Sequence, residues 1–556
     1  MRLPTKQAVL VLCVAGALGA CMDLTVPNTG NPDRERALAN PGDVESLIAS
    51  TWREYWTSHM NVAASYNPMP LIADVTSGTY ANNGALEMSS EPRRRINNST
   101  LGEFHTAGPL RDGWESWYSN ISSTVDGLKA IEDEGLVIVT ADPGEGALDH
   151  THRARTWAKF WQGVSHAEIA TLFDKGWVIS EGTEIPEDLR LPLRPWQEVR
   201  DSAIAMIEEG IALAAEEDFI TPATWVNKTP ITNGELQRMG HSFIAHYMIV
   251  SARTPAEREA VDWDLVLTHL DNGITSDFAP TMESGILVSN HINRHQLTPT
   301  STFSTRGDYY LIGPADTSGQ YQTWFSKPIN QRDKFLIATP DRRITAGPPT
   351  SHGTMFRYTG GSAEIMNEQR GLYHRSYYQW FASRTDPATV TGSGRASSGV
   401  WPLLSVKMMD LYRAEALFFN GDLQGAADII NVTRNAAGLP DVTVDGVPEA
   451  PGCVPQLAQR RREPTSPTDQ PPGICGTLYD ALIYERMIEF GNHTAYRGWM
   501  DSRGFGRLTE GTFLSLPIPA RELITIGEPV YTFGGVGSDD GHTAQKCTRV
   551  MMSCIP

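Results

Sequence analysis

The chain has 556 residues, with 65 acidic against 46 basic side chains and a formal charge of −19. So acidic a protein is a poor partner for nucleic acid and for anionic lipid. After the first 20 residues no stretch approaches the ~18 consecutive apolar residues of a membrane-spanning helix, so the sequence predicts none.

Residues 1–20 have the features of a secretory signal peptide. Arg2 and Lys6 precede an apolar stretch over residues 8–18, and small residues follow it. A basic start, a short apolar middle and small residues at the cleavage point are typical of export signals, and this stretch is too short to span a bilayer. We expect the protein to leave the cytoplasm.

Cys21 stands directly after Gly19-Ala20, at the expected cleavage point. This resembles the bacterial lipoprotein signal, in which the cysteine becomes the new N-terminus and receives lipid. The alternative is a secreted protein with a chance cysteine. We expect Cys21 to be lipidated and the polar, turn-rich residues 21–39 to form a tether.

Four more cysteines remain for the exported chain, and an even number outside the cytoplasm favours disulfides. Three pairings are possible. We favour Cys453–Cys475 and Cys547–Cys554, because each closes a local loop. A zinc site is the alternative, but it requires short paired spacings that these intervals lack.

Residues 40–556 are expected to form one domain that is mainly α, with minor β. Its N-terminal half, residues 40–275, shows apolar residues at helical spacing. A first helix is expected to begin after residues 40–43 and to carry Val44 through Trp56. Further helices are expected at 112–133, 150–173, 195–215, 232–252 and 258–272.

Two regions lack helical periodicity. Residues 61–110 contain scattered Gly, Asn and Pro, and residues 276–400 are rich in Gly, Pro, Ser, Thr and aromatic residues. Both are expected to be loops, and the second is expected to be the main ligand region.

Helical order returns in the C-terminal half, residues 401–556. A helix over 403–419, a turn at Asn420-Gly421-Asp422 and a second helix that ends at Gly438 predict a hairpin of the tetratricopeptide type. Asp422 is a suitable N-cap and Gly438 a suitable C-cap. Such a hairpin cannot bury its apolar face alone, so neighbouring helices must stack on it.

An insertion rich in Pro and basic residues follows at 441–476, and then a helix is expected at 478–491. Residues 492–556 are expected to be mostly irregular.

Several strings in this half stand out together: Arg413-Ala414-Glu415-Ala416-Leu417, Ala426-Ala427-Asp428-Ile429-Ile430-Asn431, Arg434-Asn435-Ala436-Ala437-Gly438-Leu439-Pro440, Glu485-Arg486-Met487-Ile488-Glu489-Phe490, Tyr496-Arg497-Gly498-Trp499-Met500-Asp501-Ser502-Arg503 and Leu516-Pro517-Ile518-Pro519-Ala520-Arg521-Glu522-Leu523. They resemble the signatures of the SusD/RagB-like family of outer-membrane nutrient-binding lipoproteins. Asp341-Arg342-Arg343 resembles a short element upstream. The resemblance covers about 340–523.

The resemblance implies a helical scaffold with tetratricopeptide-like hairpins and loops that carry the binding site. It implies no catalysis and no cofactor. It also implies a lipid-anchored protein of the outer membrane, facing the cell surface, that holds oligosaccharides or peptides for a SusC-like TonB-dependent β-barrel transporter.

Glu485 and Glu489 are one helical turn apart, so both carboxylates lie on one face. That spacing approaches the carboxylate pair of a retaining glycosidase, which makes a surface glycoside hydrolase an alternative function. We favour structural ion pairs, because Arg486 lies beside them and arginines lower the carboxyl pKa that a general acid needs raised. Arg413 and Glu415 are expected to belong to the same set. A third possibility is a ligand-free helical-repeat scaffold of the cell envelope.

Histidine offers no metal motif. His291 and His295, and His150 and His152, are closely spaced, but no Glu completes a His-Glu-x-x-His pattern, so no metal is expected. The stretch Gly535–Gly541 only partly matches a phosphate loop and is interpreted as an acidic surface loop, with a calcium ion left open.

Aromatic and polar side chains in the two loop regions are the candidate ligand residues. Sugar rings have apolar faces that stack on aromatic rings, while amides and carboxylates bond the hydroxyls. Packing of these rings against the helices is the alternative for each residue. The candidates are Tyr66, Asn67, Asp74, Tyr80 and Asn82 in the first region and Arg306, Asp308, Tyr309, Tyr310, Tyr321, Trp324 and Tyr358 in the second.

Overall fold

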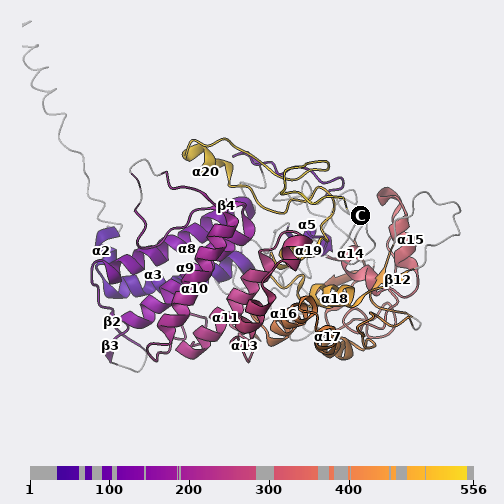
Figure 1. Ribbon diagram of the computed structural model, residues 1–556, viewed down its shortest axis with the longest axis horizontal. Helices are drawn as coiled ribbons and strands as arrows, with labels where there is room; N and C mark the ends of the chain where they lie inside the picture. Colours follow the sequence, from indigo (N-terminus) through magenta and orange to yellow (C-terminus); the bar gives the residue numbers. More distant parts are fainter. Residues whose placement is uncertain are drawn as a thin grey trace, which may run out of the picture.

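The computed structural model shows a mainly helical protein, which confirms the expected fold class (Figure 1). The structure describes residues 34–61, 69–77, 90–102, 109–142, 146–184, 186, 190–282, 306–360, 375–380, 399–400, 402–449, 452–458, 473–494 and 496–546. Strands in these ranges are two or three residues long and form only two-stranded sheets. Cys21, Cys547 and Cys554 lie outside the described residues.

Five long helices form the N-terminal half and lie side by side in Figure 1. They are α3 (Pro41–Trp56), α8 (Pro109–Glu132), α9 (Thr151–Leu172), α10 (Trp196–Ala214) and α11 (Asn233–Val250). Helix α9 lies at the centre and contacts the other four. Every residue from Thr156 to Leu172 is buried, because neighbours cover this helix on all sides.

The expected helix over 258–272 is two helices in the structure. Helix α12 (Pro255–Glu259) ends early, and α13 (Trp263–Asp271) begins after Asp262. The Asp262 side chain accepts a hydrogen bond from the Leu265 amide at 3.0 Å. An Asp that caps a helix interrupts the apolar period, which explains the break.

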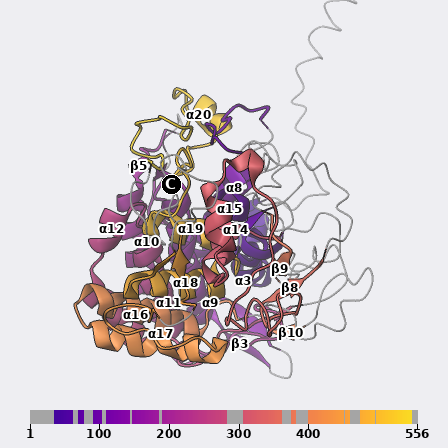
Figure 2. The ribbon, with the colours of Figure 1, turned by 90° about the vertical axis from the view of Figure 1, so that its right-hand side faces the viewer.

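The C-terminal half contains the expected helical hairpin. Helices α16 (Val406–Phe419) and α17 (Leu423–Ala437) pack on α18 (Leu478–Phe490), and Figure 2 places the hairpin at the base of the molecule. The two predicted caps are present. Asp422 accepts from the Gly425 amide at 3.0 Å, and Gly438 has φ 80°.

The segment 492–546 is mostly irregular, as expected, but it is not without helices. It contains α19 (Arg497–Phe505) and α20 (Ala520–Thr525). Every residue of α19 is buried, including its charged ones. A helix buried on all sides and rich in glycine and arginine has no apolar stripe, so the periodicity of the sequence does not reveal it.

Cys453 and Cys475 form the expected disulfide across the insertion. It lies beside a two-stranded sheet in which β11 (Gln456–Leu457) pairs with β12 (Ile474–Cys475). The disulfide and this strand pair therefore join residues 452–458 of the insertion to residues 473–476.

Short elements complete the described chain. They are α2 (Arg34–Leu38), a π-helical turn (Thr57–Asn61), α5 (Met69–Ile72), β1 (Thr76–Ser77), β2 (Val139–Ala141), β3 (Ala147–Asp149), β4 (Lys175–Gly176), β5 (Arg194–Pro195), β6 (Thr281–Met282), β7 (Arg306–Gly307), α14 (Tyr309–Ile312), α15 (Gln320–Ser326), β8 (Phe356–Tyr358), β9 (Tyr378–Trp380), β10 (Gly399–Val400) and two 3₁₀ turns (Gly313–Ala315, Ile329–Gln331).

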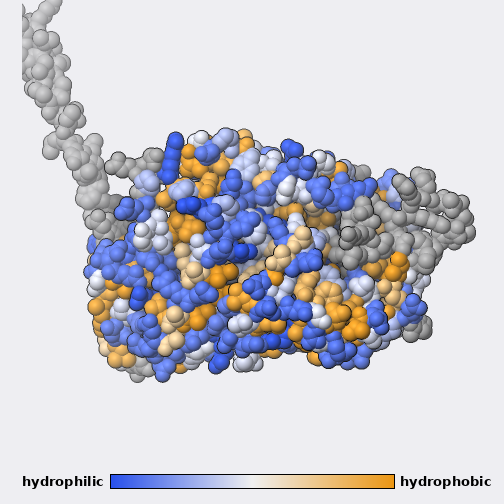
Figure 3. Space-filling model, viewed as in Figure 1, coloured by the Kyte–Doolittle hydropathy of each residue, from blue (hydrophilic) through white to orange (hydrophobic). Residues whose placement is uncertain are grey.

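Hydrophilic residues cover most of the face seen in Figure 3, and apolar residues appear there in separate patches. No helix in the described ranges is long and apolar enough to cross a bilayer.

Candidate ligand-binding region

The two loop regions singled out in the sequence meet in the structure. Strand β1 pairs antiparallel with β7, with Thr76 opposite Gly307 and Ser77 opposite Arg306. The Asp308 amide donates to the Val75 carbonyl at 3.1 Å and extends the pairing. Segments more than 200 residues apart in sequence are thereby held side by side.

Asp74 anchors this junction from a strained backbone position. Its φ is 53°, which a non-glycine residue adopts at a cost. Its carboxylate receives Arg93 through two bonds of 2.7 and 2.8 Å and the Thr509 hydroxyl at 2.8 Å. Burial lowers the pKa of Arg93, but the neighbouring carboxylates, Asp74 foremost, raise it overall above its usual value. The Asp74 side chain therefore joins three segments of the chain, those that contain Asp74, Arg93 and Thr509.

Asp308 and Arg306 are buried next to this anchor. The Asp308 carboxylate accepts from the Tyr310 amide at 2.8 Å and caps α14. The Asp308 backbone also forms an antiparallel bridge with Arg375. The carboxylate therefore orients α14 and the aromatic residues that it carries.

Four of the candidate rings form a buried cluster: Tyr309, Tyr310, Tyr321 and Trp324 are each 4% exposed or less. Tyr309 stacks on Phe335 at 4.3 Å between ring centroids, and Tyr321 stacks on Trp324 at 5.9 Å. In this conformation the ring faces pack against the protein itself.

A buried arginine completes the aromatic cluster. The Arg332 guanidinium lies 4.4 Å from the ring centroid of Trp324 and donates to the Tyr310 hydroxyl at 3.0 Å. The Tyr309 hydroxyl donates to the Phe335 carbonyl at 2.6 Å and accepts from the Phe335 amide at 2.8 Å. Desolvation raises the pKa of Tyr309 and Tyr310 well above the usual value, so both hydroxyls stay protonated.

Among the candidate rings that the structure describes, Tyr358 is the one with an exposed portion. It is half-buried at the end of β8 and lies 6.2 Å from the Tyr377 ring, which is also half-buried. The Lys334 ammonium lies 5.8 Å from the centroid of Tyr377. Two accessible phenol rings beside a cation can contact an apolar ring face and its hydroxyls.

The predicted ion-pair residues lie away from this region, at the meeting point of α16, α18 and α19. Glu415 receives Arg258 at 2.7 and 2.8 Å and Arg486 at 3.0 Å, and Arg486 also binds Asp501 at 2.7 Å. All four side chains are fully buried. Arg413, on the surface of the same helix, pairs instead with Asp271 at 2.7 Å.

Glu485 and Glu489 share one arginine. Arg343 donates to Glu485 at 2.6 Å and to Glu489 at 2.9 Å, and it also binds Asp341 at 2.8 Å. Burial alone would raise the pKa of Asp341, but the charge of Arg343 and the hydrogen bonds from Arg343 and Tyr484 together outweigh burial, so the pKa lies below its usual value. Both carboxylates of the apparent glycosidase pair are therefore engaged within the protein.

The chain is similar to known proteins at the level of structure. Neither a family model nor a curated protein matches the sequence. A SusD superfamily protein from Bacteroides vulgatus superposes with a TM-score of 0.52 at 12% identity, over 87% of this chain and 97% of its own. A SusD homolog from Parabacteroides distasonis superposes with a TM-score of 0.52 at 13% identity, over 83% of this chain and 84% of its own. A SusD superfamily protein from the same organism superposes with a TM-score of 0.52 at 12% identity, over 87% of this chain and 97% of its own.

The chain has the SusD fold. The resemblance seen in the signatures around 413–440 and 485–523 is confirmed at this level, because the similarity spans most of the chain. These signatures contain Glu415, Glu485, Arg486, Glu489 and Asp501, and the network is completed by residues outside them, such as Arg258.

Four candidates, Tyr66, Asn67, Tyr80 and Asn82, lie outside the described residues. The candidates that the structure describes lie in three places. Asp74, Arg306 and Asp308 lie at the β1–β7 junction, four rings form the buried aromatic cluster, and Tyr358 lies at the end of β8. Sequence reasoning left out Arg93, Arg332 and Phe335, which fix the geometry of this part of the SusD fold. Arg332 and Phe335 follow the predicted aromatic stretch within a dozen residues of Trp324, so extending that stretch would have included them. No feature of the sequence around Arg93 indicated its role.

Among the described residues no group of three His, Cys, Asp or Glu side chains is placed to hold a metal ion.

Proposed function

We propose that this protein is a lipid-anchored binding protein of the outer membrane. It captures oligosaccharides, or peptides, at the cell surface for import by a SusC-like TonB-dependent barrel transporter, and it does not alter them. The support comes from the SusD fold together with the export signal that the sequence predicts for residues 1–20, directly before Cys21.

The observation that carries the proposal is the pairing of β1 with β7. It brings the two predicted loop regions to one place on a rigid helical scaffold, as one binding site requires. Tyr358 and Tyr377 are the accessible rings next to it.

A glycoside hydrolase is disfavoured by the state of its candidate carboxylates. Glu485 is fully buried, and Arg343 binds both it and Glu489. A general acid needs a carboxyl group that reaches the substrate with a raised pKa, and an arginine partner acts in the opposite direction.

Binding is tested on protein that starts at residue 22, by isothermal titration calorimetry with a panel of oligosaccharides and peptides. We expect saturable binding to at least one class and no change in the ligand by chromatography afterwards. Tyr358→Ala should weaken binding about tenfold, since an aromatic stacking contact contributes ~0.5–1.5 kcal/mol beyond its buried area. Turnover of any ligand would contradict the proposal, and binding that Tyr358→Ala leaves unchanged would move the site elsewhere.

The partner and the anchor are tested in cells. Full-length protein should incorporate labelled fatty acid and co-purify with a large β-barrel, and Cys21→Ser should abolish the labelling. Envelope partners without any barrel and without any small ligand would favour the scaffold alternative.

A further inference from the structure

The second loop region, residues 276–400, has the opposite sign of charge to the chain as a whole. It carries 12 basic and nine acidic side chains, and the excess is concentrated in residues 327–395, with ten basic and five acidic ones. The whole chain has a formal charge of −19. A basic region on so acidic a protein attracts anions to that region alone. The region that holds most of the candidate ligand residues therefore favours an anionic ligand.

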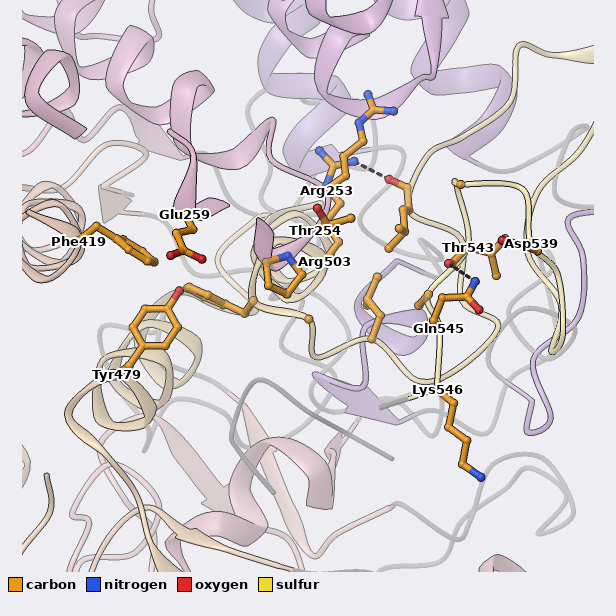
Figure 4. Close-up of a pocket in the computed structure, with 17 residues that line it drawn as sticks. Arg253, Thr254, Glu259, Phe419, Tyr479, Arg503, Asp539, Thr543, Gln545 and Lys546 are labelled. Carbon is orange, nitrogen blue, oxygen red and sulfur yellow. Dashed lines mark hydrogen bonds between the residues drawn. The ribbon is translucent and has the colours of Figure 1, made fainter. Parts of the chain in front are cut away.

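Buried arginines elsewhere in the described chain donate to the protein's own acceptors. Arg343 binds Asp341 at 2.8 Å in the network of α18. Figure 4 shows a second case at the wall of a cavity of about 570 Å³, where Arg503 donates to the Leu514 carbonyl at 2.8 Å. Both terminal nitrogens of each of these guanidinium groups have acceptors in the protein, so these two arginines hold the fold together.

Arg357, on β8, differs from these buried arginines. Its side chain is half-buried, and among the residues that the structure describes no acceptor or carboxylate lies within bonding distance of its guanidinium. Partial burial removes some of the water that stabilises a charge, and no group of the protein replaces that water here. An anion bound at this point supplies the missing partner. The Arg357 guanidinium is therefore available to a ligand.

The strand register places Arg357 beside Tyr377, one of the two accessible rings. In the antiparallel pair β8–β9, Arg357 lies opposite Gln379 and Tyr358 opposite Tyr378. Side chains alternate between the two faces of a strand, and directly opposite residues share a face. Tyr377 is two positions before Gln379, so it lies on the face of Arg357 as its diagonal neighbour. Long side chains reach across such a diagonal.

A second cation lies at the same ring. The Lys334 ammonium is 5.8 Å from the Tyr377 ring centroid, and the acidic residue next to it, Asp333, pairs with Lys327 at 3.7 Å. The ring centroids of Tyr358 and Tyr377 are 6.2 Å apart. Two half-buried phenol rings, a guanidinium and an ammonium thus form one patch. The rings can stack on the apolar face of a sugar, and the cations can bind its charged groups.

We propose that the ligand of this patch is an acidic oligosaccharide, whose sugar rings carry carboxylate groups. One sugar ring stacks on Tyr358 or Tyr377, and its carboxylate accepts two parallel hydrogen bonds from the Arg357 guanidinium, whose planar shape matches it. Lys334 adds positive charge for a neighbouring carboxylate of the same ligand. This inference rests on the proposed function, because it names the class of ligand that the binding protein takes.

The first test compares sugars that differ only in charge. Isothermal titration calorimetry, on protein that starts at residue 22, uses tetragalacturonate and tetramannuronate, each beside its methyl ester, in which every carboxylate is neutral. We expect saturable binding of at least one acid tetramer, weaker binding at high salt, and at least tenfold weaker binding of the ester.

The outcomes separate this inference from the proposed function. Equal binding of acid and ester, or binding of neutral oligosaccharides alone, would overturn the inference and leave the proposed function standing. Binding of an acidic peptide but of neither acid tetramer would assign the patch to peptides and would also overturn the inference. Failure of every sugar and every peptide to bind would overturn both.

Matched variants at Arg357 test its role directly. Arg357→Gln should weaken binding of the acid tetramer at least tenfold and binding of the ester less than twofold. Arg357→Lys keeps the charge but loses the two parallel N–H groups, so its affinity should lie between those of Arg357→Gln and the natural protein. Arg238→Gln makes the same charge change at an exposed position of α11 and should leave the affinity as it is. Equal affinities of Arg357→Gln and Arg238→Gln for the acid tetramer, with both variants folded by thermal melts, would overturn the inference.

Discussion

Arg258 and Glu415 form a bidentate ion pair, with bonds of 2.7 and 2.8 Å, although they are 157 positions apart in sequence. Both side chains are completely buried. The pair joins α12 to α16, and Arg486 and Asp501 extend it into α18 and α19. A buried charge without its partner is costly, so this network ties four helices to one arrangement.

Removal of Glu415 should therefore be strongly destabilising. We expect Glu415→Ala to lower the free energy of unfolding by ~3–5 kcal/mol, because Arg258 and Arg486 lose a buried counter-charge. Arg413→Ala, which breaks the surface pair with Asp271 on the same helix, should cost ~1 kcal/mol or less. Urea unfolding followed by circular dichroism measures both, and similar losses for the two variants would contradict this account.

The disulfide should stabilise the C-terminal half. Cys453 and Cys475 close a loop with a sequence separation of 22. The chain-entropy model gives ~3 kcal/mol for a loop of that length. We expect the double variant Cys453→Ser, Cys475→Ser to unfold at lower urea by about that free energy. Dithiothreitol should reproduce the loss in the natural protein and add little in the double variant.

Stability should fall in mild acid because of His166. This ring is completely buried, donates from Nδ1 to the Gln162 carbonyl at 2.8 Å, and accepts at Nε2 from the Ile179 amide at 3.0 Å. Desolvation lowers its pKa from 6.5 to about 4. Between these values the unfolded chain binds a proton that the folded chain does not, so stability decreases as the pH falls from about 6.5 to about 4.

The pH effect is measured by thermal melts between pH 4 and 8. The pKa difference corresponds to on the order of 3 kcal/mol at the acid end. His166→Gln should lower stability at pH 8 but make stability depend less on pH. His352→Gln, at an exposed position, should leave the change of stability with pH as it is in the natural protein. An unchanged slope in His166→Gln would assign the acid sensitivity to other groups.

Two glycines of the helical hairpin separate backbone strain from steric conflict. Gly421 has φ 86° with open space around it, whereas Gly438 has φ 80° and an added Cβ would lie 2.5 Å from Arg342 Nε. We expect Gly421→Ala to cost ~1–2 kcal/mol from the left-handed conformation alone. Gly438→Ala should cost more, because Arg342 must also move. Equal losses in urea unfolding would show that Arg342 adapts freely.

Local patterns explain what could be read from the sequence. The helices over 41–56, 109–132, 151–172, 406–419 and 423–437 were expected because their apolar residues repeat at helical spacing. In the last of them, Asp422 and Gly438 are also preferred cap types. The disulfide followed from the spacing of two cysteines around a Pro-rich insertion. Each of these features depends on residues close together in the chain.

The candidate site was only partly predictable. The sequence indicated two loop regions with candidate ligand residues, and the structure joins them through β1 and β7. Periodicity could not separate rings that pack, such as Tyr309 and Trp324, from an accessible ring such as Tyr358, because all lie in irregular segments. Burial in such a segment is decided by contacts with distant residues, Phe335 and Arg332 among them.

The sequence by itself determined the helical scaffold, its caps and the signatures of the SusD fold, since these depend on hydrogen bonds and side-chain spacing within a few turns. The tertiary structure alone decided that Arg258 binds Glu415, that Asp74 binds Arg93, and that the arginine-rich α19 is a buried helix. The reason is physical: a charged side chain enters the core only where distant segments bring its partner, and no local pattern in the chain specifies that partner.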